Sequence, residues 1–322
     1  MHWYFIDLSK AFDTVNHNIL IRKLEHYGIR GVALQWFLNY LSNRKQYVYY
    51  NNVSSSLQGI TCGVPQGSIL GPLLFILYVN DIENCSSLLN FILFADDTNI
   101  FYSCKDYQDF TKTVNLELHK LSQWFCANKL SLNVSKSNFI LFGNRTQRCY
   151  DSIFKIVIDG NSLERVSNTK FLGVYIDENL NWKHHTQQIS LKIAKNIGVI
   201  NRIKNLLPPE LLLSLYYTII QPYFLYCNII WGDANQIALK RLVCLQKRAI
   251  RVITKSSYRA SSSPLFAKLG IIKLVDVYKL QVSIFMYKAK HGMLPDCCSV
   301  LVPLVNDNLR YNFRNEHDFQ KI

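Results

Sequence analysis

The chain has 322 residues, and its 36 lysine and arginine residues outnumber its 22 aspartate and glutamate residues, which gives a formal net charge of +14. Such an excess favours a polyanionic partner, either nucleic acid or an anionic membrane surface. With 49% hydrophobic and 18% charged residues, the chain has enough apolar side chains for a large core and about two domains, which excludes a disordered basic tail.

Residues 1–80 are predicted to alternate strands with helices. Residues 3–7 form a short apolar run that ends in an acid, which is typical of a buried strand. The pair Asn51-Asn52 tolerates the left-handed conformation and therefore predicts a hairpin turn. The predicted elements are a strand at 3–7, a helix at 15–27 that ends at Gly28, a helix at 32–41, a hairpin of 46–50 with 57–61, and a helix at 71–79.

The next segment is predicted to contain more strands. Asp96-Asp97 lies between two apolar runs in a strand-turn-strand pattern, and Asp159-Gly160 is a strong hairpin signal. The predicted elements are strands at 89–94 and 98–102, a helix at 110–125, strands at 130–132 and 139–142, a hairpin of 154–158 with 163–166, and a strand at 170–176.

From Trp182 onward the pattern is helical and basic. Residues 1–181 have a net charge of +1, whereas residues 182–322 have a net charge of +13. This asymmetry predicts two units with different tasks, and the sequence as a whole predicts an α+β protein. One predicted helix has apolar residues along one face and cations along the other, which favours contact with phosphates over an ordinary solvated face. These cations are Lys240, Lys247, Arg248, Arg251 and Lys255.

Two long stretches without charged residues, 46–80 and 211–232, could be taken for membrane spans. Glycine, proline and polar residues interrupt both stretches, so buried core is the better interpretation. No secretory signal pattern occurs at the N-terminus, and the nine cysteines show no metal-binding spacing. We therefore expect an intracellular protein of the nucleus or cytoplasm that is neither secreted nor inserted in a membrane.

Three acids follow buried apolar runs, namely Asp7, Asp96 and Asp97. Carboxylates rarely occupy such positions unless they are paired or coordinate a cation. Two Mg²⁺ ions held by such acids could clamp the attacking and leaving oxygens of a phosphoryl transfer. Taken alone, however, an Asp-Asp pair between strands is more often simple turn chemistry.

The order of the surrounding motifs decides between these interpretations. The segments FIDLSKAFDTV at 5–15, GVPQGSILGPLLF at 63–75 and FADD at 94–97 resemble palm motifs A, B and C of reverse transcriptases from non-LTR (LINE-type) retrotransposons, close to the jockey-like group. Residues 128–133 with Lys136 resemble motif D, and residues 170–174 resemble motif E. The resemblance implies a right-hand palm with an antiparallel sheet at 1–181, followed by a helical thumb and basic C-terminal region at 182–322.

The resemblance also implies a role for each matching residue. Asp7, Asp96 and Asp97, with the Leu8 carbonyl, would hold two Mg²⁺ ions, with Mn²⁺ as an alternative. Phe12 would exclude a ribose 2′-hydroxyl, although it could also be a core aromatic residue. The remaining expectations are dNTP contact by Gln66 and Gly67, proton donation or phosphate contact by Lys136, a primer grip at Phe171, Leu172 and Gly173, and backbone contacts by the cations of the basic helix.

The implied function is an RNA-directed DNA polymerase that uses an RNA template, a DNA primer and dNTPs. Because the chain begins inside motif A, we expect the fingers to be largely missing and the chain to be N-terminally truncated. A second hypothesis is a catalytically inactive remnant that only binds RNA. A third, an intron-maturase enzyme, is disfavoured by the motif at 94–97 and by residues 182–185. The sequence predicts no oligomeric state.

Overall fold

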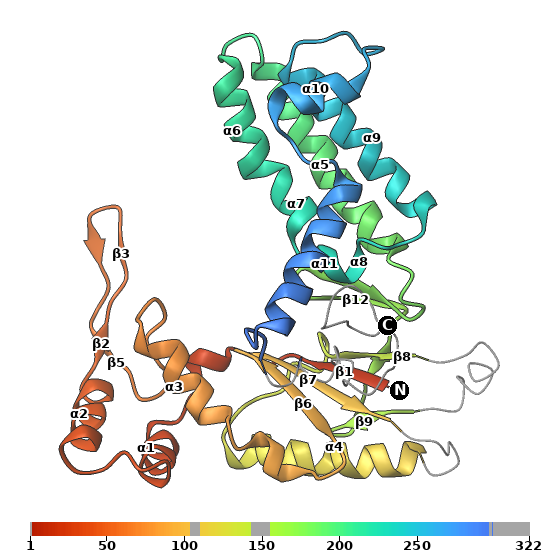
Figure 1. The fold of residues 1–322 in the computed structure, drawn as a ribbon. Coiled ribbons are helices and arrows are strands. Elements are labelled where there is room, and N and C mark those ends of the chain that lie inside the picture. Colours follow the sequence, from red (N-terminus) through yellow and green to blue (C-terminus); the bar gives the residue numbers. More distant parts are fainter. Residues whose placement is uncertain (1, 104–109, 143–154, 296–297, 299–322) are drawn as a thin grey trace. The chain divides into compact units, whose positions relative to one another are not determined.

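The structure is a computed structural model that describes residues 2–103, 110–142, 155–295 and 298. Internal contacts divide the chain into two compact units, Met1–Thr169 and Lys170–Ile322. The first unit combines a sheet with helices, and the described part of the second unit is mostly helical (Figure 1). The predicted α+β class is therefore confirmed. The division at residues 181 and 182, which separates a palm from a thumb, stays a prediction.

Five strands form the central sheet of the first unit: β1 (His2–Ile6), β6 (Asn90–Phe94), β7 (Asp97–Tyr102), β8 (Asn138–Leu141) and β11 (Glu164–Arg165). Their order is β11-β8-β1-β7-β6, and the β11–β8 pair is parallel whereas the other pairs are antiparallel. The predicted antiparallel sheet is thus a mixed sheet. β6 lies at one edge, and its outward residues Ile92 and Phe94 are 49% and 60% exposed.

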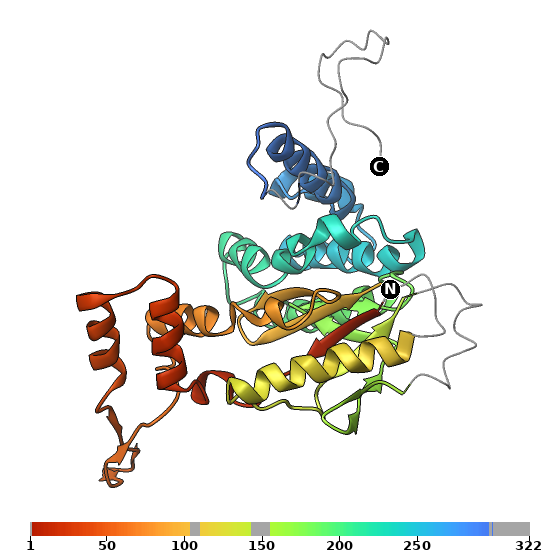
Figure 2. The same cartoon turned by 90° about the horizontal axis from the view of Figure 1, so that it is seen from below.

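The helices of the first unit are α1 (His17–His26), α2 (Gly31–Leu41), α3 (Leu70–Val79) and α4 (Phe110–Ala127). Side chains alternate between the two faces of a strand, so Tyr4 and Ile6 of β1 lie on one face and Trp3 and Phe5 on the other. Tyr4 and Ile6 belong to the same buried cluster as the apolar residues of α1, α3 and α4. Figure 2 shows α4 running along this side of the sheet.

A two-tier hairpin projects from the first unit between α2 and α3 (Figure 1). β2 (Lys45–Gln46) pairs with β5 (Gln58–Gly59), and β3 (Tyr49–Tyr50) pairs with β4 (Val53–Ser54). Asn51 and Asn52 form the turn with φ values of 48° and 63°, as their tolerance of this conformation predicts.

The second predicted hairpin is present with a different second arm, because residues 161–162 form it and residues 164–165 of the predicted arm 163–166 pair with β8 instead. β9 (Val157–Ile158) pairs with β10 (Asn161–Ser162) across Asp159 and Gly160, whose φ values are 52° and 73°. Phe154, which the sequence assigns to this hairpin, lies outside the described residues.

Two predictions of strands are wrong. Residues 130–132 do not form a strand, because only Leu132 pairs, in an isolated bridge with Leu8. Residues 170–176 are not one strand but the centre of a hairpin of β12 (Asn168–Phe171) and β13 (Val174–Asp177). The chain reverses at Leu172 and Gly173, which both adopt positive φ values, 44° and 88°.

The described part of the second unit continues with helices α5 (Lys183–Ile203), α6 (Pro209–Ile219), α7 (Gln221–Leu225), α8 (Asn228–Trp231), α9 (Gln236–Ile253), α10 (Ser262–Leu269) and α11 (Leu274–Lys290). They enclose a hydrophobic cluster of their own, which includes the isoleucine stripe of α5. The two stretches without charge contain α3, α6 and α7, so helices do form there. None of the helices in the described ranges has both the length and the apolar character needed to cross a membrane.

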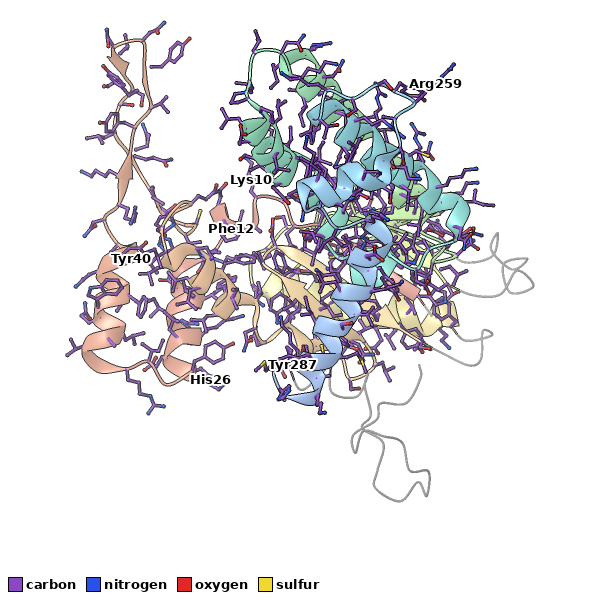
Figure 3. The ribbon with its side chains drawn as sticks, turned by 45° about the horizontal axis from the view of Figure 1, so that its top comes forward. Lys10, Phe12, His26, Tyr40, Arg259 and Tyr287 are labelled. Carbon is purple, nitrogen blue, oxygen red and sulfur yellow. The ribbon has the colours of Figure 1, made fainter. Side chains whose placement is uncertain are left out.

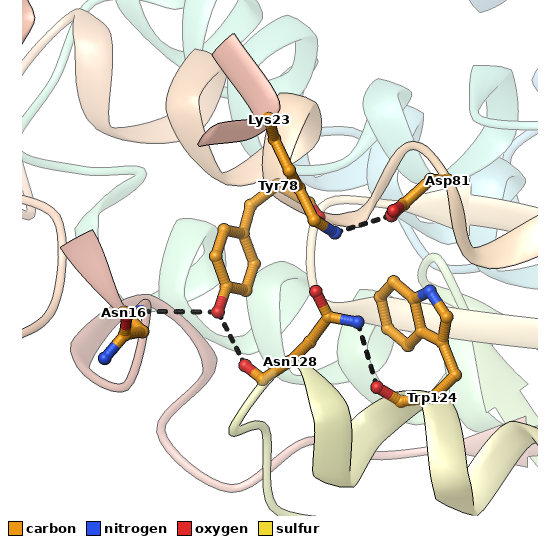
Figure 4. Close-up of polar contacts among 6 residues, drawn as sticks. All are labelled: Asn16, Lys23, Tyr78, Asp81, Trp124 and Asn128. Carbon is orange, nitrogen blue, oxygen red and sulfur yellow. Dashed lines mark hydrogen bonds and ion pairs between the residues drawn. The ribbon is translucent and has the colours of Figure 1, made fainter. Parts of the chain in front are cut away.

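A polar cluster joins α1, α3 and the end of α4 inside the first unit (Figure 4). The fully buried Tyr78 donates its hydroxyl hydrogen to the Asn128 carbonyl at 2.5 Å and accepts a hydrogen bond from the Asn16 N–H at 3.4 Å. Lys23 forms an ion pair with Asp81 at 2.6 Å. One hydroxyl group therefore links three segments that are distant in the sequence.

Removal of the Tyr78 hydroxyl should destabilise the first unit. In a Tyr78→Phe variant the Asn128 carbonyl would remain buried without this donor, which costs about 1–3 kcal/mol in the free energy of unfolding. Chemical denaturation followed by circular dichroism measures this loss. Tyr49→Phe is the matched control, because the Tyr49 hydroxyl bonds to Asn52 on an exposed hairpin and its loss should change stability little. Equal stability of the two variants would contradict the prediction.

Candidate active site

The strand register places two acids opposite each other at one end of the sheet. The last pair of the ladder between β1 and β7 is Ile6 with Thr98, so Asp7 and Asp97 are the next opposing residues. Asp97 also pairs with Phe94 of β6, and Asp96 lies in the turn between these two strands. Ala95 allows this tight turn by adopting a φ of 52°. The sheet therefore brings Asp7, Asp96 and Asp97 to the same end.

The three carboxylates influence one another electrostatically. The pKa of Asp97 is raised above its ordinary value, first by burial and then by the negative charges of Asp96 and Asp7. Repulsion of this kind disfavours full ionisation of the group unless a cation is present. The end of the sheet is thus a place where positive charge would be stabilised.

These oxygen ligands suit a hard divalent cation, which needs only one or two carboxylates when substrate phosphates and water complete its shell. Across the described residues, no three His, Cys, Asp or Glu side chains are grouped closely enough to hold a metal ion by themselves.

The backbone around Asp7 is fixed by the segment 131–137. The Asp7 N–H donates to Ser137 Oγ at 3.1 Å, and the Asp7 carbonyl accepts from the Asn133 N–H at 2.9 Å. The Ser9 N–H donates to the Ser131 carbonyl at 2.8 Å, so the Leu8 carbonyl points away from this segment. Leu8 is consequently free to offer its carbonyl on the side where the strand faces β7.

Lys136 lies on the same segment. Its N–H donates to the Asn133 carbonyl at 3.1 Å, and its side chain is exposed. The structure thus brings the backbone of Lys136 beside the end of β1, in agreement with the expected order of motifs. Among the described residues, its ammonium group forms no ion pair with Asp7.

One main-chain and one side-chain hydrogen bond join the segment of Phe12 to the segment of Gln66. The Val64 N–H donates to the Phe12 carbonyl at 2.8 Å, and Gln66 Nε2 donates to Asp13 Oδ1 at 2.8 Å. Phe12 lies on the segment that follows β1, and its side chain is half-buried (Figure 3). The centres of the Phe12 and Phe75 rings are 4.6 Å apart. Phe12 therefore has core contacts, as its alternative interpretation requires, and is also partly accessible.

The glycines of the loop 63–71 have different tasks. A Cβ atom on Gly63 would lie 2.7 Å from the Asp13 carbonyl oxygen, and one on Gly71 would lie 2.5 Å from the Pro65 carbonyl oxygen. These two glycines are therefore required by the packing of the chain itself. Gly67 has a φ of 83° and open space where a Cβ would be, so it is the glycine that a nucleotide could approach.

The predicted primer grip forms the turn between β12 and β13. The Leu172 carbonyl accepts a hydrogen bond from the Tyr226 hydroxyl, and a Cβ atom on Gly173 would lie 3.3 Å from the Tyr226 ring. Phe171 is half-buried at the end of β12. The turn is thus supported by a tyrosine at the end of α7, which no sequence motif marks.

The basic helix of the prediction is α9, and three of its predicted cations, Lys240, Lys247 and Arg248, are exposed. Two residues differ from expectation. Arg251 is half-buried, and its Nε donates to the Ala260 carbonyl at 2.8 Å. Lys255 lies beyond the helix with a φ of 53°, since the helix ends at Ile253. Arg241 is also exposed, although the sequence interpretation omitted it.

Hydrogen-bonding partners were the main features that the sequence did not reveal. Ser137 and Asn133 anchor Asp7, and Asp13 holds Gln66. No motif marks Ser137 or Tyr226, because their roles arise from contacts between distant segments. The sequence shows that Asp13 follows Phe12, but it does not show that Gln66 is the hydrogen-bonding partner of Asp13.

Comparison with known proteins identifies the family of the chain. A family model described as "Reverse transcriptase (RNA-dependent DNA polymerase)" matches residues 2–176. A probable RNA-directed DNA polymerase from transposon X-element of Drosophila melanogaster is 27% identical over 280 residues, which cover 84% of this chain and 30% of that protein. The RNA-directed DNA polymerase from mobile element jockey of the same species is 26% identical over 293 residues, 86% of this chain and 31% of that protein.

The chain thus spans about 30% of the length of these relatives. Among solved structures, telomerase from Candida albicans in complex with the TWJ fragment of telomeric RNA aligns with a TM-score of 0.42 and 12% identity. That alignment covers 84% of this chain and 51% of the telomerase chain.

The coupling among the acids can be tested directly. In an Asp7→Asn variant the pKa of Asp97 should fall toward its ordinary value of 3.8, because one of the negative charges that raise it is removed. Carboxylate NMR titration of the metal-free protein measures this shift. Asp13→Asn is the matched control, since Asp13 does not contribute to the shift, and it should leave Asp97 unchanged. An identical Asp97 titration in wild type and Asp7→Asn would refute the arrangement.

Proposed function

The chain belongs to the reverse transcriptase (RNA-dependent DNA polymerase) family, and on this basis we propose that it forms the palm and thumb of an RNA-directed DNA polymerase from a non-LTR retrotransposon. The observation that carries the proposal is the convergence of Asp7, Asp96 and Asp97 at one end of the sheet. In the proposed reaction the primer 3′-oxygen forms a bond to the α-phosphorus of a dNTP, and pyrophosphate leaves.

Asp7, Asp96, Asp97 and the Leu8 carbonyl would hold two divalent ions, which we propose to be Mg²⁺. When bound, such ions lower the pKa of the primer 3′-hydroxyl and neutralise charge on the reacting phosphates. The raised pKa of Asp97 supports this assignment, because burial and then the charges of Asp96 and Asp7 disfavour its ionised form, which a bound cation would stabilise. Mn²⁺ has the same preference for oxygen ligands and could substitute.

The incoming dNTP would bind between the segment after β1 and the loop 63–71. Phe12 would lie below the sugar, where a 2′-hydroxyl would clash with its ring. Gln66, held by Asp13 at 2.8 Å, would offer its amide, and Gly67 would allow a close approach of the backbone. Lys136 would contact or protonate the leaving pyrophosphate.

The second unit would bind the RNA template and the DNA primer. Its described residues 170–295 contain 18 basic and 5 acidic residues, an excess suited to phosphate contacts. Lys240, Lys247 and Arg248 would contact the backbone from one face of α9, and Lys255 from the segment that follows it. Arg251 would contribute less to backbone contacts, because its Nε already donates a hydrogen bond to the Ala260 carbonyl. The turn at 171–173 would contact the primer end.

The activity should depend on Asp96. Purified chain would be given an RNA template, a DNA primer and labelled dNTPs with Mg²⁺ or Mn²⁺. We expect incorporation by the wild type, and Asp96→Ala should reduce it to background because a metal-binding carboxylate is lost.

Glu25→Ala, which removes an exposed acid of α1, is the control and should retain activity. Equal incorporation by wild type and Asp96→Ala would refute the proposal. Salt-sensitive RNA binding by the wild type without incorporation would instead support an inactive RNA-binding remnant.

Phe12 should select the sugar of the nucleotide. A Phe12→Val variant should incorporate rNTPs relative to dNTPs roughly 10- to 100-fold better than wild type, because the smaller side chain leaves room for the 2′-hydroxyl. Single-nucleotide incorporation with matched dNTP and rNTP measures the ratio. If Phe12 is only a core residue packed on Phe75, both rates should fall together and the ratio should not change.

A further inference from the structure

The second unit contains a pocket whose lining extends from the predicted motif E to three helices. Its volume is about 640 Å³, and residues from β12, the turn that follows it, α5, α6 and α7 line it. Lining side chains that could bind a ligand are Lys170, Lys192, Asn196, Thr218, Tyr223 and Tyr226. None of the described residues that line the pocket is acidic. The pocket therefore combines two lysine side chains with two tyrosine rings.

Tyr226 forms a rigid wall of this pocket. Its hydroxyl is held by the Leu172 carbonyl, and its ring lies where a Cβ atom on Gly173 would be only 3.3 Å away. The side chain is nevertheless 52% exposed. A ring that is fixed at its hydroxyl and still accessible can stack on a planar ligand with little loss of conformational entropy.

Lys192 provides the charged wall. Its ammonium group lies 6.0 Å from the centre of the Tyr223 ring, in a cation–π arrangement. Burial, followed by the nearby charges of Lys192 and His184, lowers the pKa of His185 to about 4, so His185 is neutral at physiological pH. The positive charge at this wall therefore comes from Lys192, and no carboxylate in the pocket neutralises it.

We infer that this pocket binds one nucleotide of a nucleic-acid strand, with its phosphate between Lys170 and Lys192 and its base against Tyr226. Cations that follow a backbone and aromatic rings that stack on bases are the usual means of holding single-stranded nucleic acid. The hydroxyl of Thr218 and the amide of Asn196 add polar contacts without reading a base sequence.

A strand fits better than a free nucleotide. The pocket belongs to a unit whose described residues 170–295 carry 18 basic and 5 acidic residues, and such an extended field attracts a polymer of phosphates. The inference rests on the proposed function for the identity of the ligand, because a polymerase must hold a strand near its primer grip.

The test uses the full 322-residue chain and a fluorescein-labelled RNA template annealed to a DNA primer, with single-stranded overhangs. Fluorescence anisotropy gives the dissociation constant at several salt concentrations. Lys192→Gln should reduce the slope of log K against log salt by about 0.7–0.9, as expected for one lost phosphate contact. Lys195→Gln is the matched control, because Lys195 is exposed on the same helix but does not line the pocket.

Substitutions of Tyr226 test the contribution of stacking separately from that of charge. Tyr226→Leu should weaken binding roughly 5- to 100-fold, because the stacking surface is lost. Tyr226→Phe keeps the ring and should bind within about 3-fold of wild type, although it loses the bond to Leu172. Thermal denaturation of each variant identifies any that fail to fold, and in that case Lys170→Gln replaces Lys192→Gln as the charge test.

Equal slopes for wild type, Lys192→Gln and Lys195→Gln, with unchanged binding by Tyr226→Leu, would overturn the inference. If micromolar free dATP displaces the labelled strand from the wild type but not from Lys192→Gln, the pocket is a mononucleotide site and the inference is overturned. Binding is measured without catalysis. If the wild type incorporates dNTPs and Lys192→Gln leaves the salt dependence of binding unchanged, only the pocket is refuted. A chain without incorporation whose binding depends on Lys192 refutes the proposed polymerase alone.

Discussion

The candidate site depends on the register between β1 and β7. Because side chains alternate along a strand, a slip of one residue would move Asp7 to the face that packs against α4 and would place Ile6 at the open end of the sheet. Burial of Tyr4 and Ile6 in the core opposes such a slip, since it would expose both. The hydrophobic core therefore sets the positions of the acids without touching them.

The pairing of β1 with its neighbours also explains which parts of the structure could be predicted. The turns at Asn51-Asn52 and Asp159-Gly160 are determined by residues adjacent in the sequence, so local patterns were sufficient. The position of Asp96 between two strands was predictable for the same reason. The convergence of Asp7 with Asp97 followed from the resemblance, because spacing alone cannot show that two strands are neighbours.

Features that depend on contacts between distant segments were not predictable. Leu132 was expected in a strand, but its only pairing is the bridge to Leu8, and the strand pattern of its neighbours does not show this. The turn at Leu172 interrupts an apolar run that looks continuous, because a leucine with positive φ is rare. Arg251 resembled its neighbouring cations in the sequence, yet the chain returns at Ala260 and binds its guanidinium.

The open edge of β6 has a consequence for work with the isolated protein. In the part of the chain that the structure describes, β6 has no neighbour on its outer side, and Ile92 and Phe94 are exposed, so it can pair with the same strand of another molecule. The opposite edge strand, β11, has only two residues and offers a much smaller template. Self-association in solution should therefore begin at β6, so a lysine in place of Ile92 is the rational choice for improving the solubility of the recombinant chain.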